Sequence, residues 1–241
     1  MVMEKQAINS SVLTDFHSHI LPHCDHGSDS ASTSIKQLEM LESAGFKRVV
    51  ATPHFYPHKQ SVSSFLTKRE ECLNDLLSES NGISIALHLG AEVLICHGLE
   101  HMDCLHKLCI CGTNVLLLEM PLEKSWSMDL YDTVYNIAEQ GLTVVLAHTN
   151  RYPFENVAKL LENDNVFAQL NCSTVNSFKG RALIKRTVET GKVVAIGSDI
   201  HMLDNKAVKS CEKFIKWASK YTSDIFTATN KLLYEAVDFS K

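Results

Sequence analysis

Seven short apolar runs, rich in β-branched residues, recur along the chain, and most end in a histidine or a carboxylate side chain. They are VLTDFHSH (12–19), RVVATPH (48–54), ISIALHLGAE (83–92), NVLLLE (114–119), TVVLAH (143–148), VFAQLN (166–171) and VVAIGSDIH (193–201). Each run has the length of a buried parallel strand, and helix-like stretches separate the runs. The active site of parallel α/β folds forms at the carboxyl ends of the strands, so these acids and imidazoles are expected to meet at one place.

The segments between the runs predict helices over 32–44, 129–140 and 181–190, each followed by a glycine that stops the helix. Residues 206–220 and 224–238 predict two further helices that cap the C-terminal end. This alternation implies parallel strands with right-handed crossovers. Candidate ligands lie on nearly all strands, whereas an open sheet offers only one crevice, so a closed TIM-like (β/α)7 barrel is favoured. We expect a single domain over residues 1–241.

The composition excludes several classes of protein. The net charge is -5 and no Lys/Arg cluster occurs, which argues against nucleic-acid binding and makes an exonuclease a poor fit. No apolar run approaches the ~18–20 residues that span a bilayer, and the N-terminus lacks the apolar region of a signal peptide, so no membrane insertion is expected. The 8 cysteines contain no CxxC pair, which favours reduced thiols and a cytoplasmic location.

The placement of ionisable side chains points to metal chemistry. His17 and His19 end the first run, and residues i and i+2 of a strand face the same side, so both imidazoles can reach one ion. Later runs end in or are followed by further donors: His54, Glu92, Glu119, His148, Asp199 and His201. One such residue is usually a satisfied polar group, but ionisable groups at six strand ends are costly unless they are paired or bound to a metal. The pattern therefore predicts a multi-metal site, and mixed imidazole and carboxylate ligands suit Mn, Fe or Zn rather than Ca or Mg.

The motifs that carry these residues resemble a known family. They are DFHSHILPHCDHG, VVATPHFYP, LGAEV, LLLEMP, LAHTNRYP, QLNCSTV and IGSDIHML, in that order. Over about Thr14 to Asn205 the chain resembles the polymerase and histidinol phosphatase (PHP) superfamily. Within it, the chain looks like the bacterial metal-dependent protein-tyrosine phosphatases of capsule and exopolysaccharide operons. The resemblance implies a distorted seven-stranded barrel that holds three divalent transition metal ions, with Mn expected and Fe or Zn as alternatives.

The resemblance also implies a ligand set. The first ion would take His17, His19, Glu92 and Asp199; the second would share Glu92 and add Glu119 and His148; the third would take His54, His201 and a residue of the turn at 25–27. The family pattern in this turn resembles DDG, whereas this chain has Asp25-His26-Gly27. The aligned ligand is therefore His26, with Asp25 as the alternative.

The mechanism that the resemblance implies is attack on phosphorus by a metal-activated hydroxide, with Asp199 and His201 among the catalytic residues. Arg151, in the motif HTNRYP, is the candidate phosphate clamp, and a structural salt bridge is the alternative role. Lys206 is a further candidate for positive charge. Cysteine-dependent tyrosine phosphatases need Cys-x5-Arg, and none of the cysteines has an arginine six residues later. A tyrosine phosphatase of this sequence must therefore use metals.

Three functions remain open at this point. The first is hydrolysis of phosphotyrosine in a protein, with a bacterial tyrosine kinase of polysaccharide export as the implied partner. The second keeps the metal site but takes a small phosphoester such as histidinol phosphate, and the third is a non-catalytic metal-binding regulator. His23 and His58 flank the motif loops and are candidates for substrate contact. The segment Leu94–Cys111 is a candidate for contacts in a homo-oligomer.

Overall fold

A computed structural model describes residues 12–80, 84–222 and 224–235 of the chain. Within these residues all strand pairings are parallel. The strands are β1 (Thr14–Ser18), β2 (Arg48–Ala51), β3 (His54–Phe55), β4 (Ala86–Leu89), β5 (Glu92–Leu94), β6 (Val115–Glu119), β7 (Thr143–Leu146), β8 (Val166–Asn171) and β9 (Val193–Gly197). The α-helices are α1 (Ala31–Ser43), α2 (Val62–Glu79), α3 (Met128–Glu139), α4 (Phe154–Leu160), α5 (Phe178–Val188), α6 (Asn205–Tyr221) and α7 (Asp224–Glu235). Short 3₁₀ helices are η1 (Leu99–His101), η2 (Leu105–Leu108), η3 (Thr149–Arg151) and η4 (Cys172–Asn176).

The strands form two sheets, of order β1-β2-β4 and β3-β5-β6-β7-β8-β9. Two of the seven predicted runs are broken: residues 48–54 contribute β2 to one sheet and β3 to the other, and residues 83–92 lead from β4 to β5 in the same way. Pro53 lies at the first break and has no N–H to continue a ladder. β2 pairs with β4 and β3 with β5, so the two broken runs remain neighbours throughout.

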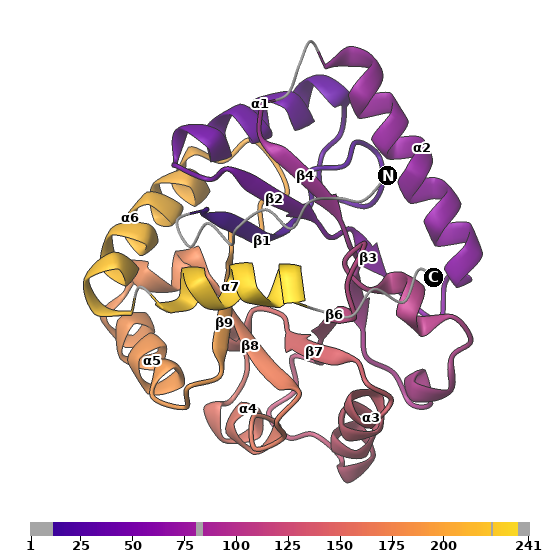
Figure 1. The fold of residues 1–241 in the computed structure, drawn as a ribbon, viewed down its shortest axis with the longest axis vertical. Coiled ribbons are helices and arrows are strands. Elements are labelled where there is room, and N and C mark those ends of the chain that lie inside the picture. Colours follow the sequence, from indigo (N-terminus) through magenta and orange to yellow (C-terminus); the bar gives the residue numbers. More distant parts are fainter. Residues whose placement is uncertain (1–11, 81–83, 223, 236–241) are drawn as a thin grey trace.

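The ring of strands closes between β1 and β9. His19 N–H donates to the carbonyl of Ile200 (3.0 Å), and Asp199 N–H donates to the carbonyl of His17 (2.9 Å). The strands therefore surround a common axis and the helices lie outside them, as Figure 1 shows. The predicted distorted seven-stranded barrel is confirmed, and the two broken runs are its distortion.

The helices near 32–44, 129–140 and 181–190 are confirmed within three residues at each end as α1, α3 and α5. α6 and α7 match the two C-terminal predictions, although residues 236–238 of the second lie outside the described residues. α2 and α4 are helices that the sequence analysis did not predict individually. None of the described helices is long and apolar enough to cross a membrane.

α7 closes the barrel at the amino ends of the strands. Thr229 Oγ1 donates to the carbonyl of Val194 (2.5 Å), and the Asn230 amide donates to the carbonyl of Val12 (2.9 Å). In Figure 1 this helix, in yellow, lies across the ring of strands. Its residue Leu233 joins the apolar core inside the barrel, which comprises Phe16, Val50, Ile110, Val115, Leu117, Val145, Ala147, Val194, Ala195 and Leu233. Apolar side chains therefore fill the barrel toward the amino ends of the strands, and the polar side chains of the site lie at the carboxyl ends.

Candidate metal centre

The strand-end donors lie where the barrel topology brings them together. His17 belongs to β1, Glu119 ends β6, and His148 follows β7 by two residues. The break after β2 places His54 opposite Glu92 in the register of β3 and β5. Asp199 and His148 have positive φ angles, of 55° and 32°, immediately after their strands. Such a backbone conformation is strained in a non-glycine residue and is typical of functional sites.

Glu92 is at the centre of this cluster and is 1% exposed. Its Oε2 atom lies 3.2 Å from Nε2 of His17, 3.2 Å from Nε2 of His19 and 3.0 Å from Nδ1 of His54. Its Oε1 atom lies 2.8 Å from Nε2 of His148. One buried carboxylate therefore contacts four imidazoles that come from three segments of the barrel: the end of β1, β3 and the residues after β7.

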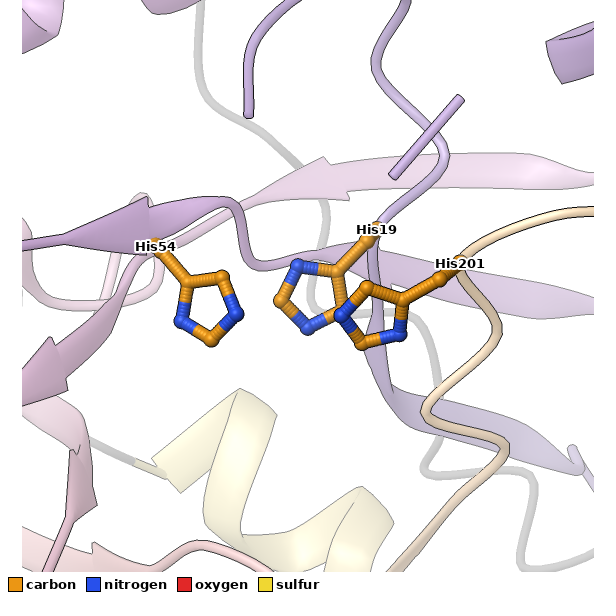
Figure 2. Close-up of side chains that lie close together, drawn as sticks. All are labelled: His19, His54 and His201. Carbon is orange, nitrogen blue, oxygen red and sulfur yellow. The ribbon is translucent and has the colours of Figure 1, made fainter. Parts of the chain in front are cut away.

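Three groups of donor atoms in the described residues are compact enough to hold metal ions, each with its atoms within 4.8 Å of one another. They are His19, His54 and His201; His17, His19 and Glu92; and His54, Glu92 and Glu119. The groups share members, so they form one continuous site. Figure 2 shows the first group, in which the His19 and His201 rings stack with centroids 3.9 Å apart and His54 faces them.

The orientation of the imidazoles fits metal binding. His19 contacts Asp25 Oδ2 through Nδ1 (2.7 Å), and His201 contacts the carbonyl of Asp199 through Nδ1 (3.0 Å). Metal-binding histidines almost always use one ring nitrogen for such a protein partner, which turns the other toward the ion. The buried atoms His54 Nδ1 and Glu92 Oε2 have no hydrogen-bond partner, although they lie 3.0 Å apart. Unpaired buried donors and acceptors of this kind are what a bound cation would satisfy.

The electrostatics of the site keep the carboxylates of Glu92 and Asp199 ionised, whereas burial and the charge of Glu92 raise the pKa of Glu119. Burial alone would raise the pKa of Glu92, but the charge of His17 and the hydrogen bond with His148 hold the pKa well below its usual range. The pKa of Asp199 is lowered in the same way, against burial, by His17, His19 and Arg151. Burial, together with the charge of His19, lowers the pKa of His201 to about 4. At neutral pH these groups are therefore anionic carboxylates and a neutral imidazole, the protonation states that metal ligands require.

The two candidate ligands in the turn at 25–27, Asp25 and His26, have different surroundings. The Asp25 carboxylate accepts from the backbone N–H of His54 (2.9 Å) and of Gly27 (2.8 Å), in addition to its contact with His19. His26 is exposed, and its ring stacks 4.7 Å from those of His54 and His201. Asp25 is thus occupied by protein donors, whereas His26 lies over the solvent side of the cluster and belongs to none of the three donor groups.

Arg151 ends η3 and lies at the rim of the site. Its guanidinium donates to Asp199 Oδ2 (2.6 Å), and the side chain is 43% exposed. It is therefore held beside the cluster by an ion pair and remains open to solvent. His23, His58 and Lys206 are exposed on segments that follow β1, β3 and β9, the same side of the barrel.

Three residues that contact the cluster were not identified from the sequence. Tyr152 contacts Nδ1 of His148 through its hydroxyl (3.0 Å) and accepts from the N–H of Met120 (3.0 Å). Gln169 and Asn171 extend from β8 toward the first donors. The signal for these two was present: QLN places two amides at i and i+2 of a strand that is otherwise apolar.

Comparison with known proteins assigns this chain to a family. The family described as capsular polysaccharide synthesis, CpsB/CapC, matches residues 13–234. This chain belongs to the CpsB/CapC family. Tyrosine-protein phosphatase CpsB of Streptococcus agalactiae is 25% identical over 218 residues, which cover 80% of this chain and 84% of that protein.

Solved structures agree on the fold of this CpsB/CapC member. Crystal structures of YwqE from Bacillus subtilis and CpsB from Streptococcus pneumoniae, described as metal-dependent tyrosine phosphatases, match with a TM-score of 0.76 at 20% identity and cover 94% of this chain and 96% of the matched chain. An amidohydrolase from Mycoplasma synoviae matches with a TM-score of 0.58 at 12% identity and covers 97% of this chain and 90% of its own. At such identities these likenesses concern the fold alone.

Proposed function

We propose that this chain is a metal-dependent protein-tyrosine phosphatase. The observation that carries the proposal is the set of overlapping donor groups around Glu92, at the carboxyl ends of the strands of a CpsB/CapC family member. The name of the Streptococcus agalactiae relative supplies the reaction and the phosphotyrosine substrate. None of the eight cysteines lies in a Cys-x5-Arg motif, which the cysteine-dependent tyrosine phosphatases require. A metal-dependent mechanism is therefore proposed for this reaction.

We further propose three ions. The first is assigned to His17, His19, Glu92 and Asp199, the second to Glu92, Glu119 and His148, and the third to His54, His201 and His26. The two donor groups that contain Glu92, and the group of His19, His54 and His201, support a site for several adjacent ions. Mixed imidazole and carboxylate donors suit manganese, with iron and zinc as alternatives.

Divalent ions bound by these donors supply a water-derived nucleophile near neutral pH and positive charge beside the phosphoryl oxygens. Arg151 then binds two of those oxygens through its planar guanidinium, and its ion pair with Asp199 aims it at the cluster. Lys206 adds positive charge at the rim. The leaving phenol has a pKa of about 10, so its departure needs little help from a protein acid.

We also propose a partner, on the basis of the family description, and a location, on the basis of the cysteines. The family description, capsular polysaccharide synthesis, supports a tyrosine kinase of polysaccharide assembly as the phosphorylated protein. We place the enzyme in the cytoplasm, where its free cysteines stay reduced. The segment Leu94–Cys111 contains the short helices η1 and η2. Its contact with a second copy of the chain in a homo-oligomer stays a prediction.

The substrate class is tested by comparing two esters with manganese-loaded protein. We expect a phosphotyrosine peptide to be hydrolysed with a kcat/KM far above that of histidinol phosphate. Turnover of histidinol phosphate alone would contradict the proposal and assign the chain to small-molecule metabolism. Metal binding without turnover of either ester would instead favour a regulatory protein.

The replacement of His26 with Asp tests the third site. Because the family pattern has an acid at this position and His26 is exposed above His54 and His201, we expect His26→Asp to keep turnover within about tenfold. The carboxylate adds one negative charge, so the relative activity with Mn and Zn should change. Kinetics with each metal check this, and an inactive, folded His26→Asp would show that the imidazole has another role.

A further inference from the structure

Gln169 is a fully buried amide on β8 that contacts donors from two other strands. Its Oε1 atom accepts from the backbone N–H of His148 (2.6 Å) and lies 3.2 Å from Nδ1 of His17. Its Nε2 atom donates to Oδ1 of Asn171 (3.0 Å), and Nδ2 of Asn171 donates to Oδ2 of Asp199 (2.8 Å). The two amides therefore connect three of the donors. His17 belongs to β1, His148 follows β7 and Asp199 follows β9.

The hydrogen bond from the backbone N–H of His148 to Gln169 fixes the donor and the acceptor in each of the other hydrogen bonds of the two amides. A backbone N–H can only donate, so the atom of Gln169 that faces His148 must be the oxygen, and the amide cannot be flipped. An amide oxygen can only accept, so Nδ1 of His17 must carry a proton. The Gln169 nitrogen must then face the oxygen of Asn171, and the Asn171 nitrogen faces Asp199.

Two consequences follow at the cluster. Because Nδ1 of His17 donates to Gln169, Nε2 is the ring nitrogen left to bind a metal ion, and it lies 3.1 Å from Nε2 of His19. Asp199 has its Oδ2 atom occupied by Asn171 and Arg151, which leaves Oδ1 turned toward the two imidazoles, 3.7 Å from Nε2 of His17 and 3.5 Å from Nε2 of His19.

The fold makes room for this arrangement at Gly197. A Cβ atom at that position would lie 2.7 Å from Nε2 of Gln169 and 2.6 Å from Cβ of His17. Both distances are too short for any larger residue without a shift of one of the two side chains. Asn171 is also 3% exposed, so neither amide has bulk water as an alternative partner.

We propose that Gln169 and Asn171 are positioning residues that set the tautomer of His17 and the orientation of Asp199 for metal binding. The proposal rests on the proposed function in that His17 and Asp199 are taken as ligands of one ion. It explains why a strand that supplies no ligand carries two buried amides on the face that meets the site.

The first test is the tautomer of His17 in the wild-type protein loaded with zinc. In long-range ¹H–¹⁵N spectra of histidine-labelled protein, we expect His17 to carry its proton on Nδ1, with the metal on Nε2. A proton on Nε2 would overturn the proposal, whatever the variants do. This readout involves no turnover, so a protein that passes it but hydrolyses no phosphoester would contradict only the proposed function.

The second test compares the zinc affinity of three variants by competition with a chromogenic chelator. Gln169→Met removes both acceptor and donor, and we expect it to weaken zinc binding about 10–100-fold and to shift the Nδ1–H signal of His17, because that proton loses its acceptor. Asn171→Leu breaks only the link to Asp199, so it should weaken binding less and keep that signal. Gln37→Met is the matched control, because Gln37 on α1 is equally buried and has no hydrogen-bond partner.

The control is expected to bind zinc as the wild type does. Unchanged zinc affinity in both folded Gln169→Met and Asn171→Leu would overturn the proposal. Where Gln169→Met does not fold, the wild-type spectrum and Asn171→Leu still decide it, since the latter leaves the N–H of His148 bonded to Gln169.

Discussion

Replacement of Glu92 with Gln is expected to reduce phosphotyrosine hydrolysis by at least about 10³-fold. Loss of a single electrostatic contact at a reacting centre already costs about 10²–10³-fold, and Glu92 contacts four imidazoles and belongs to two of the three donor groups. The amide of glutamine is neutral and offers only one acceptor atom. We therefore expect the variant to lose bound metal as well as activity, measured by kcat/KM and by elemental analysis of the purified protein.

The control for this variant is Glu100→Gln. The Glu100 side chain is 10% exposed and lies in η1, away from the donor groups. It should retain wild-type metal content and turnover. Wild-type turnover by Glu92→Gln would contradict the assignment of Glu92 as the shared ligand. Circular dichroism of both variants should first show that they are folded.

Replacement of Arg151 with Met is the second large effect, and it separates two roles. As a phosphate clamp, Arg151 acts on the transition state, so its loss should lower kcat/KM by about 10²–10³-fold while metal content stays unchanged. If Arg151 only held Asp199 in place, its loss would disturb metal binding by Asp199, and the variant would lose metal in proportion to activity. We expect the first pattern, because the Arg151 side chain is 43% exposed and available to a substrate.

Arg186→Met is the matched control for this variant. Arg186 makes an exposed ion pair with Glu155 (3.4 Å), and such surface pairs contribute little. Turnover by Arg186→Met should therefore equal that of the wild type. Loss of metal by Arg151→Met that fully accounts for its loss of activity would contradict the clamp.

The strands and their order could be predicted from the sequence because the signal is local. Each apolar run is long enough for one buried strand, and a terminal His, Asp or Glu marks the end that meets the site. The positions of His54 and Glu92 depended on more than this. They face each other because both runs break, after Ala51 and Leu89, and the length of an apolar run does not report where it changes sheets.

The residues that hold the donors were harder to identify for a physical reason. Gln169, Asn171 and Tyr152 bind no ion themselves in this account, and an amide or phenol in an apolar strand or loop is usually satisfied by the nearest backbone. His148 and His17, which Gln169 contacts, are 21 and 152 residues away from it along the chain, so only the folded barrel brings them together. The place of α7 at the amino ends of the strands likewise depends on tertiary contacts such as that of Thr229 with Val194.

Removal and return of the metal determine whether this chain hydrolyses phosphotyrosine with bound metal ions. Protein stripped with a chelator and then dialysed should release no phosphate from a phosphotyrosine peptide, and added manganese should restore release. Restoration should saturate at about three ions for each chain, as the proposed ligand set requires. Hydrolysis by fully stripped protein at the rate of the manganese-loaded form would contradict metal-dependent catalysis, because the reaction would then proceed without the ions that supply its nucleophile.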